Sequence, residues 1–156
     1  MAERLQAGDG APPFRLPAHD GRSVALADYA GRALVLFIYP AAGTPGCTGE
    51  VADFVTAEAD LAAAGYALAG LSPDPPARLA DFAAELAVTF PLLSDPGLDV
   101  VRAYGAWGER VLYGKHVVGL LRSTIVVGPD ATVQLARYNV RASGHVASLR
   151  RALGLG

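Results

Sequence analysis

Hydrophobic positions in this chain fall into two patterns, unbroken apolar runs and apolar residues at helical spacing. The run ALVLFIYP at residues 33–40 lacks a period of two, which is typical of a central strand buried on both faces. After it, Val51, Phe54 and Leu61 recur at the spacing of an amphipathic helix. The run YALAGLSP at residues 66–73 predicts a second buried strand. Together these segments predict a βαβ unit with parallel strands and a right-handed crossover.

Turn and capping residues predict where these elements begin and end. Thr44 is expected to be the N-cap of the first helix, with Pro45 as its first residue and Gly65 as its stop signal. Asp74 is expected to cap a second helix. The other signals for that helix are Pro75 and Pro76 at its start and Leu79, Phe82 and Leu86 along one face.

The flanking segments predict further strands and helices. Residues 14–26 hold two short apolar pieces around an Asp-Gly turn signal, which predicts an amino-terminal hairpin. A short strand is predicted at 89–95, and residues 96–109 are expected to form a brief helix followed by an aromatic loop. The segment 123–138 predicts a second hairpin, and a last helix is expected from about Ser143.

The order of the predicted elements defines the expected fold class. Strand, helix, strand and helix, followed by a hairpin and a closing helix, predict an α/β protein with a thioredoxin-like fold. In this fold a central mixed sheet is flanked by helices, and here it carries an amino-terminal β-hairpin extension. Repeats and low-complexity linkers are missing from the sequence, so residues 1–156 are expected to form one domain.

Composition and charge narrow the classes of function. The 156 residues are 52% hydrophobic and 18% charged, which is typical of a globular chain. The net charge is -2 and the basic residues do not cluster, so neither nucleic acid nor an anionic membrane is expected as a partner. The longest dense apolar run, residues 33–39, is far shorter than the roughly 20 residues that cross a bilayer. We found no secretory signal pattern, so we expect a cytoplasmic protein.

The single cysteine, Cys47, carries the most informative chemistry. It follows a buried strand and a turn and stands where a helix begins, so helical N–H groups and the helix dipole favour its thiolate. Because Thr44 occupies the first position of what would be a Cys-x-x-Cys pair, dithiol exchange within the chain is excluded. A lone cysteine is also compatible with an inert, buried side chain, so two hypotheses follow from position alone.

The residues around Cys47 resemble a known active site. Residues 40–50, PAAGTPGCTGE, resemble the peroxiredoxin pattern Pro-x-x-x-Thr-x-x-Cys, and in particular its bacterioferritin comigratory protein, or peroxiredoxin Q, branch. The segments 104–109, 120–130 and 138–153 resemble corresponding parts of that branch. The resemblance therefore covers nearly the whole chain.

This resemblance implies roles for five residues. Cys47 corresponds to the peroxidatic cysteine, and Thr44 to the threonine that hydrogen-bonds the peroxide and the sulfur. Pro40 resembles the proline that shields the thiolate, Arg122 the arginine that stabilises it, and Glu50 the acidic residue that holds this arginine. The implied function is reduction of hydrogen peroxide and organic hydroperoxides through a cysteine sulfenic acid, in antioxidant defence and cell redox homeostasis. This chemistry requires neither a metal nor an organic cofactor.

The sequence departs from this branch at the resolving cysteine. Many members carry it five residues after the peroxidatic cysteine, where this chain has Ala52. We therefore expect a one-cysteine enzyme whose sulfenic acid is captured by an external thiol, which is a thioredoxin, a glutaredoxin or a low-molecular-weight thiol. A monomer or a weak homodimer is expected. Ala41, Ala42 and Gly43 also replace the more polar residues that are frequent in this loop.

Two other classes of function stay open at this point. One is a redox-inactive, thioredoxin-like binding domain with a structural cysteine. The other is a cysteine hydrolase with His116 or His145 as its base, for which no oxyanion-hole motif is found. The three histidines, these two and His19, lack metal-ligand spacing, so a metal site is not expected.

Overall fold

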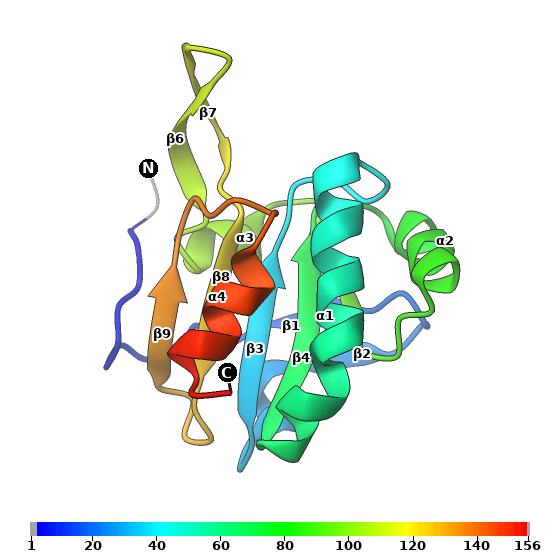
Figure 1. Ribbon diagram of the computed structural model, residues 1–156, viewed down its shortest axis with the longest axis vertical. Helices are drawn as coiled ribbons and strands as arrows, with labels where there is room; N and C mark the ends of the chain where they lie inside the picture. Colours follow the sequence, from blue (N-terminus) through cyan, green and yellow to red (C-terminus); the bar gives the residue numbers. More distant parts are fainter. Residues whose placement is uncertain (1–2, 156) are drawn as a thin grey trace.

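A five-stranded mixed sheet forms the centre of the molecule (Figure 1). The computed structural model describes residues 3–155, so both ends of the expected 1–156 domain lie outside the described residues. The strands stand in the order β5-β4-β3-β8-β9, with β3, β4 and β5 parallel and β8 and β9 antiparallel to their neighbours. Their bounds are Leu92–Ser94 for β5, Tyr66–Ser72 for β4, Ala33–Ile38 for β3, Ser123–Val127 for β8 and Val133–Arg137 for β9.

The central strand β3 is buried along its whole length, as its unbroken apolar run predicted. Leu34, Leu36 and Ile38 belong to one hydrophobic cluster, and Val35 and Phe37 belong to the other. Because successive side chains of a strand point to opposite faces, β3 supplies the middle of both cores. The sheet is therefore covered on both faces.

Helices cover one face of this sheet (Figure 1). Helices α1, Pro45–Ala63, and α4, His145–Ala152, lie across it, and α2, Pro76–Leu86, packs into the same cluster. The other face is covered by the short helix α3, Asp99–Ala103, and by the amino-terminal segment. In the part of the chain that the structure describes, we find that no helix is long and apolar enough to cross a membrane.

The predicted amino-terminal hairpin is confirmed. Strands β1, Arg15–Pro17, and β2, Ser23–Ala25, pair antiparallel, and a 3-10 helix η1 follows at Leu26–Tyr29. The connecting turn contains Gly21 at a φ of +87°, a backbone conformation that glycine adopts without strain. The Asp-Gly signal in the sequence therefore identified this turn correctly.

A hairpin that was not predicted, at residues 107–120, replaces part of the predicted aromatic loop. Strands β6, Trp107–Leu112, and β7, Lys115–Leu120, pair antiparallel and project beyond the sheet (Figure 1). Their two-residue turn has positive φ at Tyr113 and Gly114, the geometry of a tight hairpin turn. The prediction failed here because glycines and exposed charged residues interrupt the apolar pattern of both strands.

Of the two predicted helix caps, the structure contradicts Asp74 and confirms the position of Thr44. Helix α2 begins at Pro76 with Pro75 as its N-cap, so the prediction for Asp74 was wrong. The Asp74 carboxylate instead accepts hydrogen bonds from the Ala42 N–H and the Ser72 hydroxyl, because it points back towards the start of α1. Thr44 does occupy the N-cap position of α1, but its hydroxyl donates to the carbonyl of Ala41 and makes no cap bond.

Candidate active site

Cys47 is the third residue of α1 and lies beyond the carboxyl end of β3. Its side chain is 0% exposed and joins the hydrophobic cluster that contains Val51 and Phe54 of the same helix. Pro45 pre-sets the first helical φ, and Gly46 leaves room for Arg122, whose Nη2 would lie 3.4 Å from a Cβ at this position. The thiol thus stands at the positive end of a 19-residue helix in an apolar setting.

Arg122, which lies just before strand β8, contacts the sulfur of Cys47. Its Nη2 donates a hydrogen bond of 3.2 Å to Cys47 Sγ. The two residues are 75 positions apart, but Arg122 immediately precedes β8, whose Ser123 is paired with Ile38 at the end of β3. Strand pairing therefore brings the guanidinium to the helix terminus where Cys47 lies.

Glu50 holds the other arm of the same guanidinium. Arg122 Nη1 donates to Glu50 Oε1 at 2.7 Å, and Glu50 follows Cys47 by three residues, which places both side chains on one face of α1. Arg122 therefore bridges the carboxylate and the sulfur through its two terminal nitrogens. This is the fixed fork geometry that makes arginine suited to binding two acceptors at once.

Burial shifts the pKa values of the charged groups beside Cys47. Glu50 is 0% exposed, and loss of solvation raises its pKa to about 7, although the charge and hydrogen bond of Arg122 oppose this rise. Burial by itself would lower the pKa of Arg122, but the charges of Glu50 and Cys47 raise it overall. Glu50 Oε2 is buried without a hydrogen-bond partner among residues 3–155. Arg122 consequently stays cationic, and Glu50 titrates near neutral pH.

Thr44 and Pro40 lie on the loop between β3 and α1. Thr44 is exposed, and its hydroxyl donates a hydrogen bond of 2.7 Å to the Ala41 carbonyl. Pro40 is half-buried at the end of the strand. In this conformation the hydroxyl hydrogen of Thr44 is directed to the loop backbone and not to the sulfur. The catalytic roles expected for these two residues remain predictions.

The histidines do not form a pair with the cysteine. His145 is buried on α4, where its Nε2 lies 2.7 Å from Thr124 Oγ1. Burial, together with the positive charges of Arg137 and Arg122, lowers the pKa of His145 to about 4, so the ring is neutral near pH 7. His116 is exposed on β7. This arrangement gives no support to the cysteine-hydrolase hypothesis, and residues 3–155 contain no group of three or more potential metal ligands.

Sequence reasoning missed two residues that hold the loop before Cys47. Asp74 bonds the Ala42 N–H, and Arg78 on α2 donates to the Ala42 carbonyl. These contacts join residues 32 and 36 positions apart, so no local pattern marks them. In the sequence, these contacts were indicated only by the small residues 41–43, which leave room for the side chains of Asp74 and Arg78.

Comparisons with known proteins identify relatives of this chain in sequence and in fold. The family described as AhpC/TSA matches residues 7–136. A Mycobacterium tuberculosis protein named as a peroxiredoxin is 51% identical over 152 residues, 97% of each chain. Peroxiredoxin Bcp of Escherichia coli is 36% identical over 141 residues, 90% of each chain. The solved structure of the Xanthomonas campestris bacterioferritin comigratory protein matches with a TM-score of 0.85 at 31% identity, over 99% of this chain and 98% of that one.

The fold and the site together define a thiol-dependent enzyme on a thioredoxin-like scaffold. The chain belongs to the AhpC/TSA family, and within it to the peroxiredoxins of the bacterioferritin comigratory protein, or peroxiredoxin Q, branch. Peroxiredoxins are thiol peroxidases, so membership implies peroxide substrates and thiol reductants. The predicted family and the predicted fold class are confirmed.

Proposed function

We propose that this protein is a one-cysteine peroxidase in which the Cys47 thiolate attacks the terminal oxygen of a hydroperoxide. The sulfur gains that oxygen as the O–O bond breaks, which gives a cysteine sulfenic acid and releases water or an alcohol. The observation that carries the proposal is the 3.2 Å hydrogen bond from Arg122 Nη2 to Cys47 Sγ at the start of α1.

Three features of the site favour this step. The first-turn N–H groups and the dipole of α1 stabilise negative charge at Cys47. Arg122 adds a full positive charge at hydrogen-bond distance. Because the sulfur is buried, both interactions act in surroundings less polar than water, where they are stronger. Arg122 also stabilises the charge that develops on the departing oxygen.

Thr44 and Pro40 complete the proposed site. Rotation of the Thr44 hydroxyl away from the Ala41 carbonyl would let it donate to the bound peroxide. This exchange replaces one hydrogen bond with another, so it costs little. Pro40, half-buried at the end of β3, restricts the access of water to the thiolate. Glu50 acts through Arg122, whose position it fixes with a 2.7 Å ion pair.

The catalytic cycle then needs a thiol from another molecule. The sequence has one cysteine, and Ala52 occupies the position where many members of the branch have the resolving one. A thioredoxin, a glutaredoxin or a small thiol would attack the sulfenic acid, form a mixed disulfide and release water. A second thiol then reduces this disulfide and restores Cys47. The cytoplasmic location that such reductants would require stays a prediction.

Rapid-mixing kinetics test the proposal. The reduced protein and a Cys47→Ser variant are each mixed with hydrogen peroxide or an organic hydroperoxide, and peroxide consumption is followed. We expect fast consumption of one equivalent by the wild type and only background loss with the variant. Each candidate reductant is then added alone to identify those that sustain turnover. Equally slow consumption by both proteins would instead support a thioredoxin-like binding domain with an inert cysteine.

A further inference from the structure

The loop 138–144, which connects β9 to α4, lies against Arg122. The N–H of Val140 donates to the carbonyl of Arg122 at 2.9 Å. A Cβ on Gly46 would lie 3.4 Å from Arg122 Nη2 and 3.6 Å from Ala142 Cβ, so the guanidinium and Ala142 pack against the same point of the α1 backbone. This Nη2 is the nitrogen that donates to the cysteine sulfur. The loop therefore forms one wall of the candidate active site.

The side-chain hydrogen bonds that hold this loop lie at its two ends. At its start, the hydroxyl of Tyr138 donates to the carbonyl of Tyr104 at 2.6 Å. Just past its far end, His145 Nε2 lies 2.7 Å from Thr124 Oγ1. The N-cap residue of α4 is Gly144, which has no side chain to cap the helix. His145 is therefore the residue that fixes the α4 end of the loop.

The contact between His145 and Thr124 is buried and directional. His145 is 5% exposed and Thr124 is 1% exposed. A buried hydroxyl or imidazole that loses its partner is left without solvation, so the contact tolerates little displacement of α4 along β8. The His145 ring also meets the Phe54 ring of α1 edge to face, with 6.3 Å between the ring centroids. The histidine thus joins α4 to both β8 and α1.

Thr124 connects this contact to Arg122. The two residues are two positions apart where the chain enters β8, so their side chains point to the same face of the sheet. Thr124 pairs with Phe37 of β3, whose ring stacks on Phe54 at 4.2 Å. Only 14% of the Arg122 side chain is exposed. The guanidinium therefore stays beside the sulfur as long as the loop and α4 keep their places.

A neutral imidazole suits a position close to two guanidinium groups. Arg122 before β8 and Arg137 on β9 are the charged groups that act on His145, and the α1 residue against its ring is the uncharged Phe54. Burial, together with these two charges, lowers the pKa of His145 to about 4. At neutral pH the ring consequently carries no charge that would repel Arg122.

We propose that His145 is a positioning residue for the peroxide reaction, which holds loop 138–144 against Arg122 so that Nη2 stays directed at the cysteine sulfur. The 3.2 Å hydrogen bond to the sulfur depends on the place of the guanidinium, so a small shift of the loop weakens it. Misplacement of a reacting group by about 1 Å can slow a reaction by up to about 100-fold. The inference rests on the proposed function.

Rapid mixing with hydrogen peroxide measures the rate constant of the Cys47 reaction in a set of variants. His145→Leu removes the hydrogen bond but keeps an apolar side chain, and His145→Gln keeps a partner for Thr124. Thr124→Val breaks the same hydrogen bond from the strand. His145→Leu and Thr124→Val are each also combined with Arg122→Met. Urea unfolding measures the stability of every variant.

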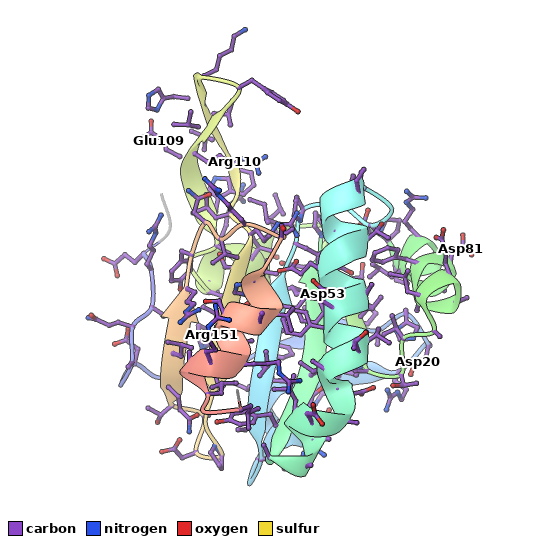
Figure 2. The ribbon with its side chains drawn as sticks, in the orientation of Figure 1. Asp20, Asp53, Asp81, Glu109, Arg110 and Arg151 are labelled. Atoms are coloured by element: carbon purple, nitrogen blue, oxygen red, sulfur yellow. The ribbon has the colours of Figure 1, made fainter. Side chains whose placement is uncertain are left out.

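Two substitutions on α4 serve as matched controls. Ser148→Ala removes the 2.8 Å hydrogen bond from Arg137 Nη1, which ties the same helix to β9. Arg151→Gln removes a charge from the exposed side of the helix (Figure 2). Both leave the contact between His145 and Thr124 in place, so both should react with peroxide at the wild-type rate.

His145→Leu and Thr124→Val should react with peroxide about tenfold more slowly than the wild type, and His145→Gln should recover most of the rate. In the Arg122→Met background His145→Leu should slow the reaction no further, although it should still lower the free energy of unfolding. A histidine with a structural role alone would lower stability and leave the peroxide rate unchanged, or lower it equally in both backgrounds. Either result would overturn the inference.

Two features of the design keep the outcomes separate. Where His145→Leu does not fold, Thr124→Val and its combination with Arg122→Met decide the same question. A wild type that fails to consume peroxide would overturn the proposed function. A wild type that consumes peroxide, with His145→Leu and Thr124→Val at the same rate, would overturn only the role of His145.

Discussion

Replacement of Glu50 by glutamine should expose a pH dependence of stability that the wild type conceals. The pKa of Glu50 is raised from 4.5 to about 7, chiefly by burial. Because the folded-state pKa is raised, the contribution of Glu50 to stability is fully present below pH 4.5 and is lost as the pH rises through about 7. At about 1.4 kcal/mol per pH unit, this interval corresponds to about 3 kcal/mol.

His145 has the opposite dependence over nearly the same range. Its pKa is lowered from 6.5 to about 4, again chiefly by burial. Its contribution to stability is present above pH 6.5 and is lost as the pH falls through about 4, with a similar size of about 3 kcal/mol. Between pH 4.5 and 6.5 the two contributions oppose each other. Together they should leave the wild-type free energy of unfolding nearly level in this window.

Urea unfolding at several pH values from about 4.5 to 7.5 tests this compensation. The stability of Glu50→Gln should rise with pH relative to the wild type, because only the His145 contribution remains. The stability of His145→Gln, which keeps a partner for Thr124, should fall with pH. The double variant should again be level. Single variants whose pH dependence parallels that of the wild type would refute the assigned titrations.

Three further predictions concern the candidate site. Arg122→Met should slow the reaction of Cys47 with peroxide about 100-fold in rapid mixing, and a rate within twofold of the wild type would contradict a role for the 3.2 Å contact. Thr44→Val should slow peroxide reduction about tenfold. It should lower the free energy of unfolding, measured with urea, by only about 1 kcal/mol, because it removes the hydrogen bond from the Thr44 hydroxyl to the Ala41 carbonyl. An unchanged rate would leave Thr44 with a local structural role alone. Gly43→Ala should lower the free energy of unfolding by about 2 kcal/mol. The loss should be smaller in an Arg78→Met background, which relieves the clash between the new Cβ and the guanidinium. An equal loss in both backgrounds would contradict the close approach of Arg78 to Gly43.

Local patterns predicted the central part of the fold well. The strand, helix and strand of residues 33–73 are confirmed because a doubly buried strand needs an unbroken apolar run, and because Pro45 and Gly65 mark the helix ends. The β6–β7 hairpin was missed because exposed strands do not need such a run. Asp74 was assigned to the wrong partner, since its bonds reach a loop 32 residues away.

The same distinction applies to the site. A motif in one continuous segment singled out Thr44 and Cys47, and the helix start places the thiol where anions are favoured. The contact of Cys47 with Arg122 depends on the pairing of β3 with β8, which no local spacing encodes, and it was expected only from a family resemblance. The direction of the Thr44 hydroxyl and the hold of Arg78 on Ala42 depend on side-chain positions that only the folded structure defines.

The position of the transferred oxygen decides whether Cys47 is the peroxide-reducing residue. The reduced protein is treated with one equivalent of hydroperoxide without any thiol, quenched, trapped with a sulfenic acid reagent and mapped by peptide mass spectrometry. We predict stoichiometric sulfenic acid at Cys47 within seconds in the wild type and much slower formation in Arg122→Met. An unmodified Cys47 alongside consumed peroxide, or oxygen found on Met1 instead, would contradict it.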